Sequence, residues 1–201
     1  MIQQLRSAPN LLTLLRLIFV PFAVIAVVGG HYGWALAIFV IAGISDGLDG
    51  LLARWLKQMT TLGQYLDPVA DKLLLSTMFL VLSSVRRIPW SVTVLVFSRD
   101  TIIVIVCSLL YATGAVKIFR PSLLGKANTL AQILTVLFVL LHEVRPDHWI
   151  ALCRRWGINF TIVLTILSGV HYVLRLAFTH RDTTDDPAQA AAARIENQRT
   201  H

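Results

Sequence analysis

Apolar residues are gathered in six long runs, separated by short segments rich in glycine, proline or charge. Each run has close to the roughly 20 residues that a helix needs to cross the hydrocarbon of a bilayer. The runs are Leu11 to Val28, Trp34 to Leu52, Leu66 to Val85, Trp90 to Tyr111, Leu123 to Leu141 and Ile158 to Leu176. The breaks are Gly29-Gly30, Arg54 to Gly63, Arg86 to Pro89, Thr113 to Ser122 and Glu143 to Gly157. The pattern predicts an all-α fold, an integral membrane six-transmembrane-helix bundle forming one domain over residues 1–178, with a polar tail over residues 179–201.

Composition supports a membrane protein. Of the 201 residues, 56% are hydrophobic and only 14% are charged, which is far more apolar than a soluble domain of this length. The formal net charge is +7, but the cations are spread over the predicted loops instead of lying on one face. Attraction to anionic lipid head groups explains them better than nucleic-acid binding, so no nucleic-acid partner is expected.

The distribution of lysine and arginine predicts an orientation. With the N-terminus in the cytoplasm, the outer loops carry Arg86, Arg87, Arg145, Arg154 and Arg155. The inner segments then carry the larger set, which is Arg6, Arg54, Lys57, Lys117, Arg120, Lys126, Arg175 and Arg181. This bias favours both termini inside. No cleavable signal is recognisable in the first run, so we expect a multi-pass protein of a bacterial inner (plasma) membrane.

Four aspartates lie close together in sequence at the end of the second run and the start of the third. On a helix, Asp46 and Asp49 share one face, and so do Asp67 and Asp71. A carboxylate in or near hydrocarbon costs several kcal/mol unless it is paired, hydrated or metal-bound. Oxygen ligands suit hard cations such as Mg²⁺ or Mn²⁺. The cluster predicts a divalent metal site holding two ions, or one ion beside a free general base, on the cytoplasmic side.

Small and basic residues accompany the aspartates. Gly50 and Gly63 remove side chains next to the carboxylates, which allows close approach of a ligand such as a nucleotide. The same glycines would also serve close helix packing. Arg54 lies one turn beyond the carboxylates, where it can neutralise them or bind a phosphate.

The spacing of these residues resembles a known signature. Written as Asp46-x2-Asp49-Gly50-x2-Ala53-Arg54-x8-Gly63-x3-Asp67-x3-Asp71, it matches in full the motif of the CDP-alcohol phosphatidyltransferase family. The segment from Pro9 to Thr13, with Arg16, is similar to the opening of that family. The resemblance covers roughly residues 8 to 176 and includes the six-span layout.

The resemblance implies a mechanism. Two divalent cations, Mg²⁺ or Mn²⁺, would be held by Asp46, Asp49, Asp67 and Asp71 and would bind the pyrophosphate of CDP-diacylglycerol. Asp71 would also act as general base toward an acceptor hydroxyl, and CMP would leave by direct displacement. The CDP pocket would be lined by Gly50, Ala53, Arg54 and Gly63. The family resemblance also implies a homodimer.

The acceptor is left open by the sequence. The chain is most similar to the glycerol branch, which contains phosphatidylglycerophosphate synthases, accepting glycerol 3-phosphate, and CMP-forming cardiolipin synthases, accepting phosphatidylglycerol. Candidate acceptor-binding residues are Arg99 and Asp100, an ionisable pair inside the fourth run, and Lys126 at the start of the fifth. Cys107 and Asn128 stand where phosphatidylglycerophosphate synthases usually have cations, which favours phosphatidylglycerol. The greater abundance of phosphatidylglycerophosphate synthases in bacteria favours glycerol 3-phosphate.

Two other classes of function also fit parts of the pattern. Intramembrane carboxylates mark metal and proton transporters too, but a transporter gives no reason for Gly50, Ala53, Arg54 and Gly63 at these spacings. A catalytically inactive lipid-binding member of the family is disfavoured by the presence of all four aspartates. The sequence therefore favours an enzyme of acidic phospholipid biosynthesis.

Overall fold

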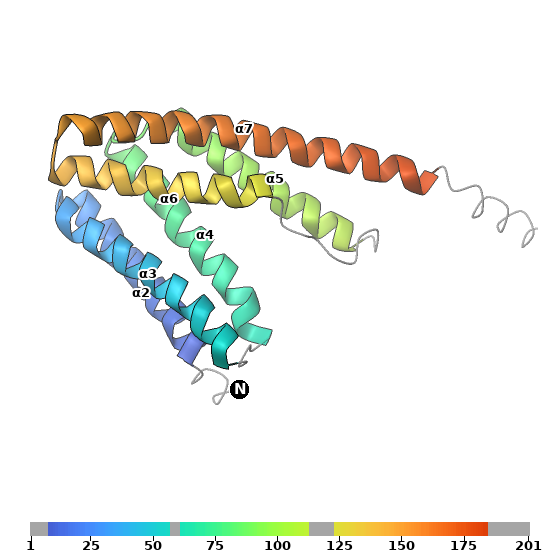
Figure 1. Ribbon diagram of the computed structural model, residues 1–201, viewed down its shortest axis with the longest axis horizontal. Helices are drawn as coiled ribbons and strands as arrows, with labels where there is room; N and C mark the ends of the chain where they lie inside the picture. Colours follow the sequence, from blue (N-terminus) through green and yellow to red (C-terminus); the bar gives the residue numbers. More distant parts are fainter. Residues whose placement is uncertain (1–7, 57–60, 113–122, 185–201) are drawn as a thin grey trace, which may run out of the picture.

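The part of the chain described by the computed structural model consists of α-helices joined in sequence (Figure 1). Its backbone is described for residues 8–56, 61–112 and 123–184, and its side chains for 17–45, 72–105 and 123–171. These residues form the six helices α2 (Ala8–Val28), α3 (Tyr32–Leu56), α4 (Thr61–Ser84), α5 (Trp90–Ala112), α6 (Leu123–Val144) and α7 (His148–Thr184). The predicted all-α architecture with six helices is confirmed. The tail beyond Thr184 lies outside the described residues.

One predicted break is wrong. The stretch from Glu143 to Gly157 was expected to connect two helices, but α6 continues to Val144 and α7 already begins at His148. Apolar residues recur at helical spacing after Pro146, and Ile150 is buried among them. Gly157 lies within α7, where a Cβ atom would come 3.1 Å from the Thr135 hydroxyl of α6. The glycine therefore permits close packing of two helices instead of ending one.

The outer surface of the bundle is strongly apolar. Within the described residues, Leu123–Val144 and His148–His171 are long and apolar enough to span a membrane. Shorter apolar helical stretches occur at Leu17–Val28, Tyr32–Ser45 and Lys72–Ser84. Trp34, Ile25 and Val104 are each more than 60% exposed. Side chains of this kind are suited to contact with lipid and not with water.

Three short turns gather at one end of the molecule, which we call the turn end: residues 29–31, 85–89 and 145–147 (Figure 1). The first turn ends α2 with Gly30 at a φ of +74°, while the amide of His31 donates to the carbonyl of Ala26 over 2.8 Å. This hydrogen-bond pattern is the Schellman cap that glycine favours. Helices that begin and end in such tight turns are held side by side at this end.

The hydrophobic core lies among α2, α3, α4, α6 and the first turns of α5. Its fully buried large side chains include Met78, Phe79 and Leu82 of α4, packed with residues such as Val27 and Leu140. Helix α2 packs against both α3 and α4, while α7 packs against α5 and α6. Figure 1 shows the two groups of helices diverging away from the turn end. We call the opposite end, where α3 ends and α4 begins, the aspartate end.

Candidate functional site

The predicted site residues fall on the two helices that meet at the aspartate end. Asp46, Asp49, Gly50, Ala53 and Arg54 lie in the last three turns of α3. Gly63, Asp67 and Asp71 lie in the first three turns of α4. The side chains of these eight residues lie outside the described set, so their roles stay predictions. Among the side chains that are described, no three His, Cys, Asp or Glu residues gather as a metal site.

The backbone keeps the two halves of the motif close. Only four residues separate Leu56, the end of α3, from Thr61, the start of α4. A chain of that length spans at most about 18 Å even when fully extended. Figure 1 shows the end of α3 and the start of α4 at the same end of the molecule, with the start of α2 beside them. The topology thus brings all four aspartates to one region, as the motif requires.

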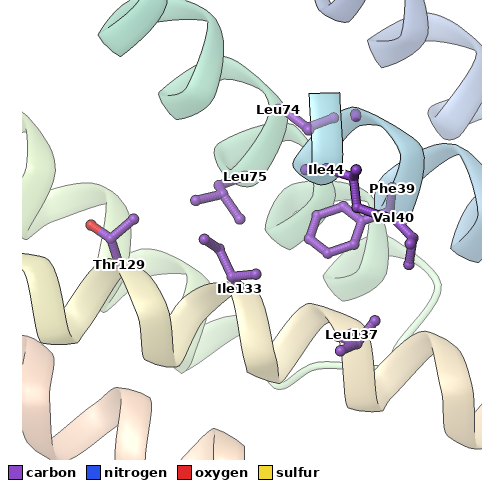
Figure 2. A pocket seen from close by; sticks show the side chains of 10 residues that line it. Phe39, Val40, Ile44, Leu74, Leu75, Thr129, Ile133 and Leu137 are labelled. Carbon is purple, nitrogen blue, oxygen red and sulfur yellow. The ribbon is translucent and has the colours of Figure 1, made fainter. Parts of the chain in front are cut away.

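An apolar pocket opens among helices that include the two carrying the aspartates (Figure 2). Its volume is about 270 Å³ and its walls come from α3, α4 and α6. The lining residues are Phe39, Val40, Ala42, Gly43, Ile44, Leu74, Leu75, Thr129, Ile133 and Leu137. Ile44 precedes Asp46 by two residues and Leu74 follows Asp71 by three, so the pocket begins less than one helical turn from the motif.

The chemistry of this pocket suits hydrocarbon. Thr129 carries its one side-chain hydroxyl, which donates to the carbonyl of Gly125 over 3.2 Å within α6. The remaining lining side chains are apolar, so a charged or polar head group would find no hydrogen-bonding partner among them. The pocket can therefore accept part of an acyl chain whose head group lies at the aspartates.

Arg99 and Asp100 form a charged network with Lys72 of α4. The two carboxylate oxygens of Asp100 bind different cations: Oδ1 is 2.7 Å from Nη1 of Arg99, and Oδ2 is 2.6 Å from Nζ of Lys72. Nη2 of Arg99 donates to the Ser168 hydroxyl of α7. Arg99 and Asp100 are only 10% and 15% exposed. The network therefore connects α4, α5 and α7, and its two charges on α5 are largely desolvated while Lys72 is 44% exposed.

Lys126, the third predicted acceptor-binding residue, takes no part in the hydrogen bonds and ion pairs of this network. It lies in the first turn of α6 with an exposed side chain. Two residues further, Asn128 is fully buried and its Oδ1 accepts a 2.9 Å hydrogen bond from Thr165 of α7. Asn128 thus belongs to the contact between α6 and α7, so the structure gives this neutral residue a packing role.

A second charged cluster lies at the turn end. Glu143 of α6 is 3.1 Å from Arg87 of the α4–α5 turn and 3.9 Å from Arg154 of α7. Arg87 also donates to the Tyr32 hydroxyl of α3 over 3.3 Å. The hydrogen bond with Tyr32, aided by the charge of Glu143, raises the pKa of the Arg87 side chain above its ordinary value. Arg87 is therefore a permanent cation in a cluster that joins three helices and a turn.

Comparison with known proteins agrees with the motif. A family model described as CDP-alcohol phosphatidyltransferase matches residues 6–174, which include five complete helices and most of α7. The chain belongs to the CDP-alcohol phosphatidyltransferase family. Members of this family are membrane-embedded and use divalent metal ions, so the chain is a membrane-embedded transferase. This assignment does not favour the transporter alternative.

Relatives of this phosphatidyltransferase carry two kinds of name. A probable phosphatidylglycerophosphate synthase of Mycobacterium tuberculosis is 34% identical over 178 residues, covering 86% of this chain and 82% of the relative. A putative cardiolipin synthase of the same organism is 32% identical over 175 residues, covering 84% and 83%. A CDP-diacylglycerol–glycerol-3-phosphate 3-phosphatidyltransferase of Salmonella choleraesuis is 34% identical over 174 residues, covering 83% and 93%. The similar identities do not separate the two acceptors.

Two residues of the charged network were not identified from the sequence. Lys72 directly follows Asp71, and Ser168 lies in the middle of an apolar helix. A usable signal exists for Lys72, because a lysine and an aspartate in neighbouring apolar helices tend to pair. Ser168 carries no such signal, since a lone serine in a membrane helix usually bonds to its own backbone.

Proposed function

We propose that this phosphatidyltransferase moves the phosphatidyl group of CDP-diacylglycerol onto a glycerol-type acceptor and releases CMP, in acidic phospholipid biosynthesis. The observation that carries the proposal is the complete eight-residue motif, whose two halves belong to the last turns of α3 and the first turns of α4. The family and the names of the relatives support the same reaction.

In this proposal the acidic residues of the motif hold the metal ions and remove a proton. Four carboxylates fit hard divalent cations, and the ligands would be Asp46, Asp49, Asp67 and Asp71. Two Mg²⁺ or Mn²⁺ ions bound there would neutralise the pyrophosphate and the departing CMP. Asp71 would take the proton of the acceptor hydroxyl while the hydroxyl oxygen attacks the phosphatidyl phosphorus. The new P–O bond forms as the pyrophosphate P–O bond breaks, and CMP carries away the bonding electron pair.

The substrates would be held by separate parts of the molecule. Gly50, Ala53, Arg54 and Gly63 would line the CDP pocket. The apolar pocket between α3, α4 and α6 would take part of a diacylglycerol chain, because it is uncharged and begins beside Asp46 and Asp71. Of the predicted acceptor-binding residues, Arg99 and Lys126 would supply positive charge to an anionic acceptor, with Asp100 balancing Arg99. Glycerol 3-phosphate and phosphatidylglycerol both fit this description.

The cellular setting is part of the proposal. The aspartate end would face the cytoplasm of a bacterial inner membrane, supported by the excess of lysine and arginine in the segments at that end. The enzyme would act as a homodimer, as the family resemblance implies. Residues 1–178 would form the catalytic membrane domain, and the polar tail would have no catalytic role.

The deciding experiment measures CMP release by the purified protein in detergent micelles. CDP-diacylglycerol and Mn²⁺ are supplied with either glycerol 3-phosphate or phosphatidylglycerol, and each product is identified by its mass. We expect release with one of the two acceptors, loss of release with EDTA, and its return with added Mn²⁺. Silence with both acceptors would contradict the proposal.

A variant tests the assignment of Asp71. We expect Asp71→Asn to lower kcat by at least about 10²-fold, because general-base catalysis contributes roughly 10²- to 10⁴-fold. Asp185→Asn, in the polar tail, is the matched control and should keep normal activity. Full activity of Asp71→Asn would exclude this residue as the base.

A further inference from the structure

The charged network offers a role for Asp100 that differs from acceptor binding. We infer that Asp100 is a positioning residue, which fixes the catalytic turn of α4 by tying Lys72 to α5 and α7. The inference rests on the proposed function of the aspartates, and it concerns how the fold holds them in place.

Both oxygens of the Asp100 carboxylate pair with cations of the protein. One oxygen is 2.6 Å from the Lys72 ammonium and the other is 2.7 Å from the Arg99 guanidinium. Both distances are those of strong charge-assisted hydrogen bonds. At 15% exposure the carboxylate has lost most of its hydration, so its charge depends on these cations for compensation.

The network continues from Asp100 into α7. Arg99 donates to Ser168, and a Cβ at the next residue, Gly169, would come 4.0 Å from Cγ of Arg99. The Arg99 side chain therefore lies against α7 near Ser168 and Gly169. The chain of contacts runs from Lys72 on α4 through the two charged residues of α5 to Ser168 on α7.

An acceptor-binding role fits Asp100 poorly. Both proposed acceptors are anions, which a carboxylate repels. The positive charge left over in the network belongs to Arg99 and Lys72, whose two cations outnumber the single carboxylate between them. Within the described side chains, Nε of Arg99 is buried without a hydrogen-bond partner, so Arg99 keeps an unused donor, while each oxygen of Asp100 already pairs with a cation.

The position of Lys72 gives the link its significance. Lys72 is covalently next to Asp71 and lies within the same helical turn, so a fixed Lys72 side chain limits how far α4 can rotate about its axis there. The turn that contains Asp67 and Asp71 is held by the same constraint. Mutation of residues that do not bind a metal themselves but fix the orientation of its ligands typically lowers metal affinity or activity by about 10- to 100-fold.

The test compares Asp100→Asn and Lys72→Met with Glu143→Gln. The Glu143 variant likewise removes a carboxylate that contacts two cations, Arg87 and Arg154, but this carboxylate lies at the turn end and not at the aspartate end. Mn²⁺ affinity is measured without turnover, from the electron paramagnetic resonance signal of free Mn²⁺. The kcat, the KM of the acceptor and the melting temperature Tm in detergent are measured on the same samples.

We expect both network variants to weaken Mn²⁺ binding and lower kcat by about 10- to 100-fold, with an unchanged acceptor KM. Lys72→Arg should restore most of both, and the double variant should be no worse than the poorer single variant, because both break one link. Glu143→Gln should lower Tm and leave Mn²⁺ binding and kcat unchanged. If Asp100→Asn fails to fold, Lys72→Met decides, since its side chain is 44% exposed and its loss leaves Asp100 paired with Arg99.

Two results would overturn the inference. A raised acceptor KM with normal Mn²⁺ binding would make Asp100 part of the acceptor site. Normal Mn²⁺ binding and kcat in both variants would make the network a stability element. If the unmodified enzyme released no CMP with either acceptor, the proposed function would fail, and the Mn²⁺ titration would still judge the role of Asp100 by itself.

Discussion

The backbone of Arg86 is strained, and the neighbouring sequence gives no sign of this strain. It follows α4 with a φ of +59°, a conformation that favours glycine. The amide of Arg87 donates to the carbonyl of Leu82 over 2.7 Å and that of Arg86 to Ser83 over 3.0 Å, which together form the same cap that Gly30 provides for α2. The side chain of Arg86 is exposed, so burial of this side chain does not compensate for the strain.

This strain leads to a prediction about Arg86→Gly. We expect the variant to gain roughly 0.5–1 kcal/mol of stability, because glycine adopts a positive φ without steric cost while losing more chain entropy on folding. Arg86→Ala keeps the strain and serves as the control. Thermal unfolding in detergent should rank the glycine variant above both the control and the unmodified protein, and a lower Tm for it would show that the exposed guanidinium matters.

At the level of single residues, the sequence predicted the motif but not the side-chain contacts of the neighbouring charged network. The aspartates stand out because four carboxylates within 26 residues are costly in an apolar chain. Arg99 and Asp100 stood out for the same reason. The bonds from Asp100 to Lys72 and from Arg99 to Ser168 join residues 28 and 69 positions apart, and such contacts depend on tertiary packing that no local pattern contains.

The helices themselves were predicted well because apolar runs of membrane length leave few alternatives. The error at residues 143–157 came from reading charge and glycine as signs of a turn. Arg154 lies within α7, where it donates to the carbonyl of Arg87 over 2.9 Å. Gly157 fits against Thr135 of α6. Both residues serve contacts between helices, which sequence composition alone does not distinguish from a loop.

The pocket formed by three helices predicts a change in lipid preference. We expect Ile133→Trp, which fills the pocket from α6, to lower kcat/KM for long-chain CDP-diacylglycerol by about tenfold, the equivalent of roughly two methylene groups losing their apolar contacts. Short-chain donors should be affected less. Leu134→Trp, at the next residue, is comparably exposed but lies outside the pocket lining, and it should change neither. Equal losses with long and short chains would place the acyl chains elsewhere.

Considered as a whole, the molecule has one end closed by short turns and charge pairs and another that carries the motif. Glu143, at 9% side-chain exposure, is the anion shared by Arg87 and Arg154 at the closed end. Through these arginines it connects α6 to α7 and to the α4–α5 turn. This arrangement separates the residues that hold the bundle together from those that act on substrate.

This separation of structural and catalytic residues predicts that Glu143→Gln lowers stability without changing activity. We expect it to lower the free energy of unfolding by about 2 kcal/mol, less than for a fully buried pair because Arg87 is 41% exposed. Thermal unfolding in detergent measures the loss, and initial rates of CMP release well below the new Tm should match those of the unmodified enzyme. Lower rates at that temperature would show that the two ends are coupled.

The length of α7 also fixes how far the protein extends from the membrane. Its 37 residues make a helix of about 55 Å, which is longer than the roughly 30 Å of the hydrocarbon core. The helix therefore continues for about 25 Å beyond the hydrocarbon into the head-group layers and the water. In experiments on the enzyme in vesicles, a fluorescent label at Thr184 would therefore report the distance between the end of this helix and the bilayer surface.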